Sequence, residues 1–234
     1  IPRQGAVCVL AAAAVVVDDV AAGAAAVAVV PLADPGATGP TAHVTLADLL
    51  GAETSRHTDA GFAGHCGERA GAIVLALEAG GHAFVVAIEP ATGALRWRTD
   101  LGVGTFDLPG MRTVRRRSPD ADPFSGTLAP TLPILLGEVG TGNARLVAVD
   151  TATGTVVGAA PASPALGRAR LLRDGERSYL FVPGTQLLMS FDPNGRVSGI
   201  ASAAGFEPVW PAQLAEQHVW LFDAHRLVVL DGVS

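Results

Sequence analysis

The sequence contains no lysine, and it is also poor in aromatic residues and in cysteine. All 16 basic residues among the 234 are arginines, against 22 acidic residues, and the formal net charge is −6. A chain of this charge lacks the broad basic surface that general nucleic-acid binding requires. Its one basic cluster, Arg112 with residues 115–117, is followed by Asp120 and Asp122, so a solvated loop is expected there.

Aromatic residues make up only 5% of a chain that is 49% hydrophobic, so valine, alanine, leucine and isoleucine must fill its core. The 28 glycines and 16 prolines are spread along the sequence, which favours many short strands joined by turns over long helices. The apolar run at residues 6–17 is shorter than the about 20 residues that cross a bilayer. It is either a secretory hydrophobic region or, as we prefer, the start of a buried hairpin.

Only two cysteines are present, Cys8 and Cys66, and they form neither an adjacent pair nor a C-x-x-C motif. A cysteine-based zinc site is therefore not expected. One disulfide bond and two buried thiols both remain open at this point. The sequence also lacks a G-x-S-x-G nucleophile motif and a G-x-x-x-x-G-K phosphate loop, which argues against serine-type hydrolysis and nucleotide binding.

The most informative feature is a repeated phrase: an apolar run, an acidic residue, a Thr-Gly turn and a second apolar run. It occurs at residues 85–97 and 146–157, with weaker copies at 188–195 and 227–232. The copies recur about every 40 residues once residues 106–125 are set aside, and this period with short strands is typical of propeller blades. The predicted hairpins pair residues 14–17 with 26–30, 73–77 with 83–88, 132–136 with 145–149, 179–182 with 186–191, and 219–222 with 226–230.

The phrase resembles the repeat of the pyrroloquinoline-quinone-type (PQQ-like) β-propellers. The resemblance implies that the Thr-Gly turn links the third and fourth strands of a blade, and that the tryptophan packs between blades. Glycine suits the tight turn because it adopts a positive φ without strain. The residues that carry the resemblance are Glu89, Thr92, Gly93 and Trp97, then Asp150, Thr153 and Gly154, then Asp192 and Gly195, and last Asp231 and Gly232.

We therefore expect an all-β fold, a β-propeller of about four to five four-stranded antiparallel blades or part of a larger ring. Residues 1–234 are expected to form a single domain with loop insertions at 40–71 and 106–125. If the ring closes on itself, an N-terminal strand near residues 6–10 would complete the last blade.

Quinone-dependent dehydrogenation is the activity that the family name suggests, with PQQ and calcium as cofactors. Many such enzymes carry adjacent cysteines above the quinone, and this chain has none. Its repeat resembles more closely the non-catalytic relatives, which include outer-membrane assembly lipoproteins and bacterial surface domains. We therefore expect a non-enzymatic binding scaffold in the periplasm or at the cell surface, with no catalytic residues, no cofactor, no transmembrane segment and a protein partner. The loop residues Met111, Arg115, Arg116 and Arg117 are candidates for partner contact.

A metal-binding module is a further alternative, based on the segment 57–68. This segment concentrates side chains that coordinate zinc or another divalent ion. Their spacing matches no established ligand pattern, so a polar loop between blades is the preferred interpretation. The candidate ligands are His57, Asp59, His65 and Cys66.

Overall fold

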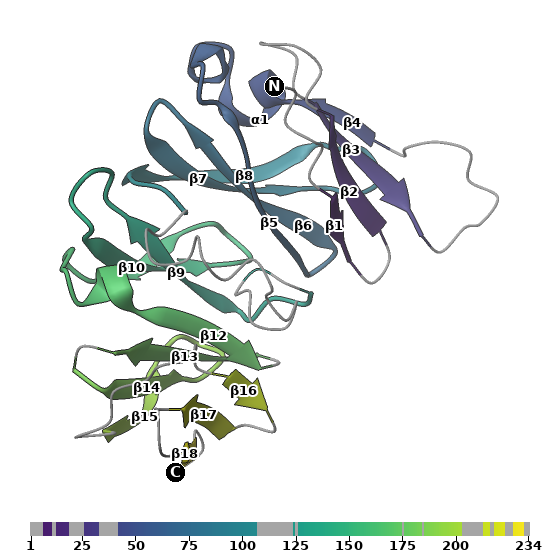
Figure 1. Ribbon diagram of the computed structural model, residues 1–234. Helices are drawn as coiled ribbons and strands as arrows, with labels where there is room; N and C mark the ends of the chain where they lie inside the picture. Colours follow the sequence, from purple (N-terminus) through teal and green to yellow (C-terminus); the bar gives the residue numbers. More distant parts are fainter. Residues whose placement is uncertain are drawn as a thin grey trace. The chain divides into compact units, whose positions relative to one another are not determined.

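Five antiparallel sheets contain the strands of the described chain, and consecutive strands are hydrogen-bonded neighbours in each sheet (Figure 1). The computed structural model describes residues 7–10, 13–18, 26–32, 42–106, 124, 126–174, 176–183, 185–202, 213–215, 218–222 and 227–231. The chain divides into two compact units. The first contains residues 1–106, 124–127 and 151–155, and the second contains residues 107–123, 128–150 and 156–234.

The first unit holds two four-stranded sheets. One sheet consists of β1 (Val7–Val9), β2 (Ala13–Asp18), β3 (Ala26–Pro31) and β4 (Ala42–Thr45), and the other of β5 (Gly61–Arg69), β6 (Ala72–Ala79), β7 (His82–Ile88) and β8 (Leu95–Val103). Strands β6 and β7 are apolar at nearly every position because both of their faces are covered. Alternate residues of β6, including Ile73, Leu75 and Leu77, share one apolar core with Val27 and Val29 of the first sheet.

A disulfide bond joins the two sheets of the first unit. Cys8 of β1 is bonded to Cys66 of β5, with their Cα atoms 6.2 Å apart. This bond settles the alternative that the sequence left open. It closes a long loop of the chain, and such a link stabilises a fold by restricting the unfolded state.

The second unit holds the other three sheets. They consist of β9 (Thr131–Gly137), β10 (Ala144–Asp150) and β11 (Val156–Ala159); of β12 (Arg170–Asp174), β13 (Arg177–Val182), β14 (Leu187–Phe191) and β15 (Val197–Ser202); and of β16 (Gln213–Ala215), β17 (His218–Phe222) and β18 (Leu227–Asp231). Side chains of the first two of these sheets, among them Leu135, Leu171, Leu180 and Phe191, form one apolar core.

The sheets confirm the prediction of an all-β fold, and each of the five predicted hairpins is present as an antiparallel strand pair. Helical structure in the described residues is limited to α1 (Leu46–Leu50) and the 3-10 turns η1 (Thr54–Arg56) and η3 (Leu166–Arg168). None of the described helices has the length and apolarity to cross a membrane.

Segment 40–71 differs from the loop insertion that the sequence suggested. It contains β4, the short helix α1 and all of β5. Helix α1 starts at a capping box in which the Thr45 hydroxyl accepts from the Asp48 N–H at 3.1 Å and the Asp48 carboxylate accepts from the Thr45 N–H at 2.9 Å. The Thr45 hydroxyl also donates to the Asp48 carboxylate at 2.7 Å, and this hydrogen bond, followed by the one from the Thr45 N–H, lowers the pKa of Asp48.

Two further expectations concern the N-terminal strand and the loop insertion at 106–125. The N-terminal strand β1 pairs with β2 in the first sheet and does not complete the last one. Most of the expected insertion at 106–125 lies outside the described residues, as do Met111, Arg115, Arg116 and Arg117. The expectation of a single domain stays a prediction.

Candidate functional site

The three best copies of the sequence phrase adopt one geometry. In each, the register shifts two residues before the acidic residue, at Ala87/Ile88, Ala148/Val149 and Ser190/Phe191. The glycines that follow have φ values of +71°, +75° and +76° at Gly93, Gly154 and Gly195. The acidic residues Glu89, Asp150 and Asp192 therefore stand at the same point of three sheets, where the chain turns into the outermost strand.

Turn residues 151–155 pack against the first unit's strand β8. A Cβ atom on Gly154 would lie 2.6 Å from Cε3 of Trp97, and the Thr99 hydroxyl donates to the Gly154 carbonyl. Thr92 and Thr153 each accept a hydrogen bond from the N–H two residues later, at 3.2 Å. Asp231 ends β18, and Gly232 lies outside the described residues.

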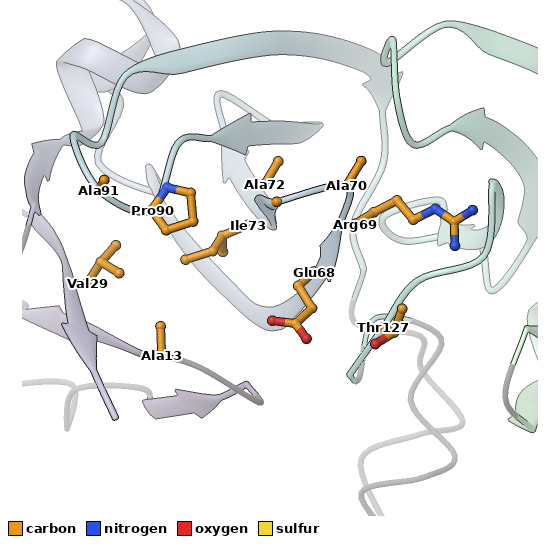
Figure 2. Close-up of a pocket in the computed structure, with 11 residues that line it drawn as sticks. Ala13, Val29, Glu68, Arg69, Ala70, Ala72, Ile73, Pro90, Ala91 and Thr127 are labelled. Carbon is orange, nitrogen blue, oxygen red and sulfur yellow. The ribbon is translucent and has the colours of Figure 1, made fainter. Parts of the chain in front are cut away.

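A pocket of about 480 Å³ opens in the first unit, beside the turns that follow β5 and β7 (Figure 2). One wall comes from the first sheet and the rest from the second sheet and residue 127. Most of its lining is apolar: Ala13, Val29, Ala70, Ala72, Ile73, Pro90 and Ala91, with Gly71 in the turn. The polar residues along it are Glu68, Arg69 and Thr127.

Strand geometry places Glu68 on the apolar side of this pocket. Glu68 pairs with Ile73 and Ile73 with Ile88, so the three share one face of the sheet. Ile73 and Ile88 belong to the core shared with the first sheet. Figure 2 shows the Glu68 carboxylate directed into the space between Ala13 and Thr127.

Arg69 is the next residue of the strand and lies on the opposite face, because successive side chains of a strand alternate. Figure 2 shows its guanidinium extending away from Val29 and Ile73. The backbone of Glu68 is fixed by its N–H, which donates to the Gly126 carbonyl at 2.8 Å, and by a parallel bridge to Thr127. Its carboxylate has no hydrogen-bond or ion-pair partner among the described residues.

Arg96 of β8 holds the rim of the pocket together. Its guanidinium donates to the Glu89 carboxylate in the turn after β7 and, at 3.0 Å, to the Ala70 carbonyl in the turn after β5. Ala70 and Gly71 have φ values of +49° and +71°, which makes this turn tight and, at Ala70, strained. One side chain therefore fixes both turns that form the rim.

The four candidate metal ligands have other roles in the structure. Cys66 is in the disulfide bond, and His65 stacks on Phe124 with ring centroids 5.7 Å apart. The Asp59 carboxylate accepts from the N–H groups of Gly80 and Gly81 at 2.8 and 2.9 Å, and these bonds, Gly80 first, lower its pKa.

The ring of His57 lies next to Gly80, within about 3.1 Å of the position that a Cβ atom would take there. Within the described ranges no three His, Cys, Asp or Glu side chains form a group that could hold a metal. The segment 61–69 is strand β5 rather than the expected polar loop between blades, and alternation along a strand separates neighbouring ligands.

Comparison with known proteins gives a fold but no family. No family model and no curated protein matches the chain. Among solved structures, BamB from Moraxella catarrhalis matches 95% of this chain and 58% of its own length, at 14% identity and a TM-score of 0.50. The fold is that of a β-propeller. AztD from Citrobacter koseri matches 100% of this chain at 13% identity with a TM-score of 0.45. The chain spans a little over half the length of both proteins.

Sequence reasoning missed the pocket. Its lining is largely alanine and turn backbone, which carry no chemical signature. The available signal was Glu68-Arg69-Ala70-Gly71, two charges followed by a turn ahead of a strongly apolar strand.

Proposed function

We propose that this protein is a non-enzymatic β-propeller scaffold that works outside the cytoplasm and binds a protein partner at the pocket of its first unit. In this proposal the scaffold needs no resident cofactor. The observation that carries it is the pocket itself: a largely apolar recess with a rim fixed by Arg96 and with the carboxylate of Glu68, which none of the described residues pairs. Preformed apolar recesses with a few placed polar groups are typical of binding sites.

The disulfide bond supports the proposed compartment. Disulfides persist in the periplasm, at cell surfaces and in secreted proteins, and they are rare in the cytosol. Cys8 and Cys66 are the only cysteines of the chain and are bonded to each other. The β-propeller fold supports a scaffold role, since it presents turns and loops on rigid sheets.

Site-specific photocrosslinking tests this function. A photoreactive residue is placed at Ala91, which is exposed on the pocket rim, in the protein produced in its native host. The matched control carries the same residue at Ala47, which is exposed on α1. We expect a discrete protein adduct from position 91 and none of the same mass from position 47.

Two results would overturn the function. One is the absence of any adduct at position 91 under conditions in which the protein is folded and oxidised. The other is a stoichiometric cofactor, detected by metal analysis or by a quinone absorbance band, together with substrate turnover.

A further inference from the structure

We propose that the pocket binds an extended segment of the partner in which an apolar side chain is followed by arginine. The apolar side chain enters the recess, and the arginine pairs with Glu68. This inference rests on the proposed function and adds to it the chemistry of the bound segment.

The apolar half of the segment follows from the lining. Val29 comes from the first sheet, Ile73 from β6, and Pro90 from the turn after β7, so the recess is walled on several sides. Its volume of about 480 Å³ lies within the about 300–1,000 Å³ typical of ligand pockets. Val29 and Ile73 are about 1% exposed, so they form a fixed floor rather than a movable flap. Removing an apolar side chain from water here is the main driving force for binding.

The basic half follows from charge. Glu68 lies on the pocket face of the sheet, and Arg69 lies on the other face. The Glu89 carboxylate, in the turn after β7, is already bound by Arg96. Among the residues that the structure describes, the Glu68 carboxylate is therefore an unpaired negative charge beside an apolar floor. A guanidinium suits it better than an ammonium because arginine pairs with a carboxylate through two parallel hydrogen bonds.

The rim is organised before binding. Arg96 ties Ala70 to Glu89, and the turn glycine Gly93 is buried against Val44 of β4. A binding site that is already ordered loses little conformational entropy when a ligand arrives. A short extended peptide is therefore expected to bind measurably without the rest of the partner.

Three capped pentapeptides test the inference: Ser-Leu-Arg-Ser-Gly, a version with glutamine in place of arginine, and a version with serine in place of leucine. Binding to the full chain is followed by NMR titration at millimolar peptide. We expect the first peptide to bind most tightly and to shift the amide signals of residues 68–73 and 90–91. Glu68→Gln should weaken the first peptide about fivefold and leave the glutamine peptide unchanged.

Glu53→Gln is the matched control, because Glu53 is an exposed carboxylate of the same unit outside the pocket. It should leave all three affinities unchanged. Ala91→Trp, which adds bulk at the rim, should abolish binding of the first peptide. Equal binding of the arginine and glutamine peptides, equal loss in both glutamate variants, or no titration by any peptide would overturn the inference.

Failure of this inference is distinguishable from failure of the proposed function. If position 91 still crosslinks a partner whose affinity is unaffected by Glu68→Gln, the scaffold stands and the apolar–arginine segment is wrong. If a cofactor and turnover are found instead, the scaffold itself is wrong.

Discussion

Strands β8 and β11 follow two turns of the same geometry, but the two strands differ in length and in the side chains they carry. Both begin after an acidic residue, a register shift and a glycine with φ above +70°. β8 runs for nine residues and carries Arg96 and Trp97, whereas β11 runs for four. At the two equivalent places β11 has Val157 and Gly158, and all four of its residues are exposed.

This difference shows that the repeat specifies the turn but not the outer strand that follows it. The turn is the same because the backbone requires a positive φ there, whatever follows. The outer strand is free to vary, and at β8 an arginine ties its own turn to the turn after β5. The pocket is therefore the result of side chains added to one copy of a common scaffold. The following predictions test that distinction, from the largest expected effect to the smallest.

Removing the disulfide should have the largest effect and should be confined to the first unit. The double variant Cys8→Ser, Cys66→Ser is expected to lose about 3–4 kcal/mol of unfolding free energy, because the bond closes a long loop of the unfolded chain. Urea denaturation with and without reductant measures the loss. Hydrogen exchange should rise in β1 and β5 and stay unchanged in β13; a uniform rise would contradict the assignment.

Gly154→Ala tests the shared turn geometry. The new Cβ would combine a φ of +75° with a clash 2.6 Å from the Trp97 ring, and we expect a loss of about 2–3 kcal/mol. Gly142→Ala is the control, since Gly142 has a φ of +74° and nothing within 4 Å of its added Cβ. Its cost should be only about 1 kcal/mol, from backbone strain alone. Equal losses in chemical denaturation would show that packing against Trp97 contributes nothing.

Arg96→Gln tests whether Arg96 holds together the two turns that form the pocket rim. The ion pair is more than a third exposed at the arginine, so solvent screening limits the expected loss of stability to about 1 kcal/mol. Hydrogen exchange of the amides at 70–72 should increase. Arg196→Gln is the matched variant, because Arg196 follows the equivalent turn after Asp192 and is exposed. An unchanged exchange rate at 70–72 in Arg96→Gln would show that Arg96 does not restrain this turn.

Asp59→Asn should reveal a small pH dependence. Hydrogen bonds from Gly80 and Gly81 lower the pKa of Asp59 in the folded state. A lowered folded pKa contributes stability above the unfolded value of about 4, and this contribution is lost as the pH falls through the folded pKa. At pH 7 the variant should be about 1 kcal/mol less stable, and the difference should vanish in strong acid. A difference that is constant with pH, measured by urea denaturation, would contradict this origin.

The hairpins and their turns could be predicted from the sequence because local patterns determine them. Apolar runs such as 73–77 and 83–88 must be buried, and a Gly-containing turn must separate them. Strand β5 could not be recognised, since Gly61, Gly64 and Gly67 interrupt its pattern and its register shifts between Phe62 and Cys66. The Cys8–Cys66 bond and the pocket depend on segments far apart in the chain. Only in the folded chain do Val29, Glu68 and Pro90 come together to line the pocket.

The most direct test of the central claim uses the partner obtained by crosslinking at position 91. Its affinity is measured for the parent protein and for Ala91→Trp, whose added side chain occupies the pocket rim. We predict a loss of at least about tenfold in affinity with an unchanged melting temperature, because the bulky side chain blocks the recess without disturbing the core. The same affinity in a folded Ala91→Trp protein would show that this pocket is not where the partner binds.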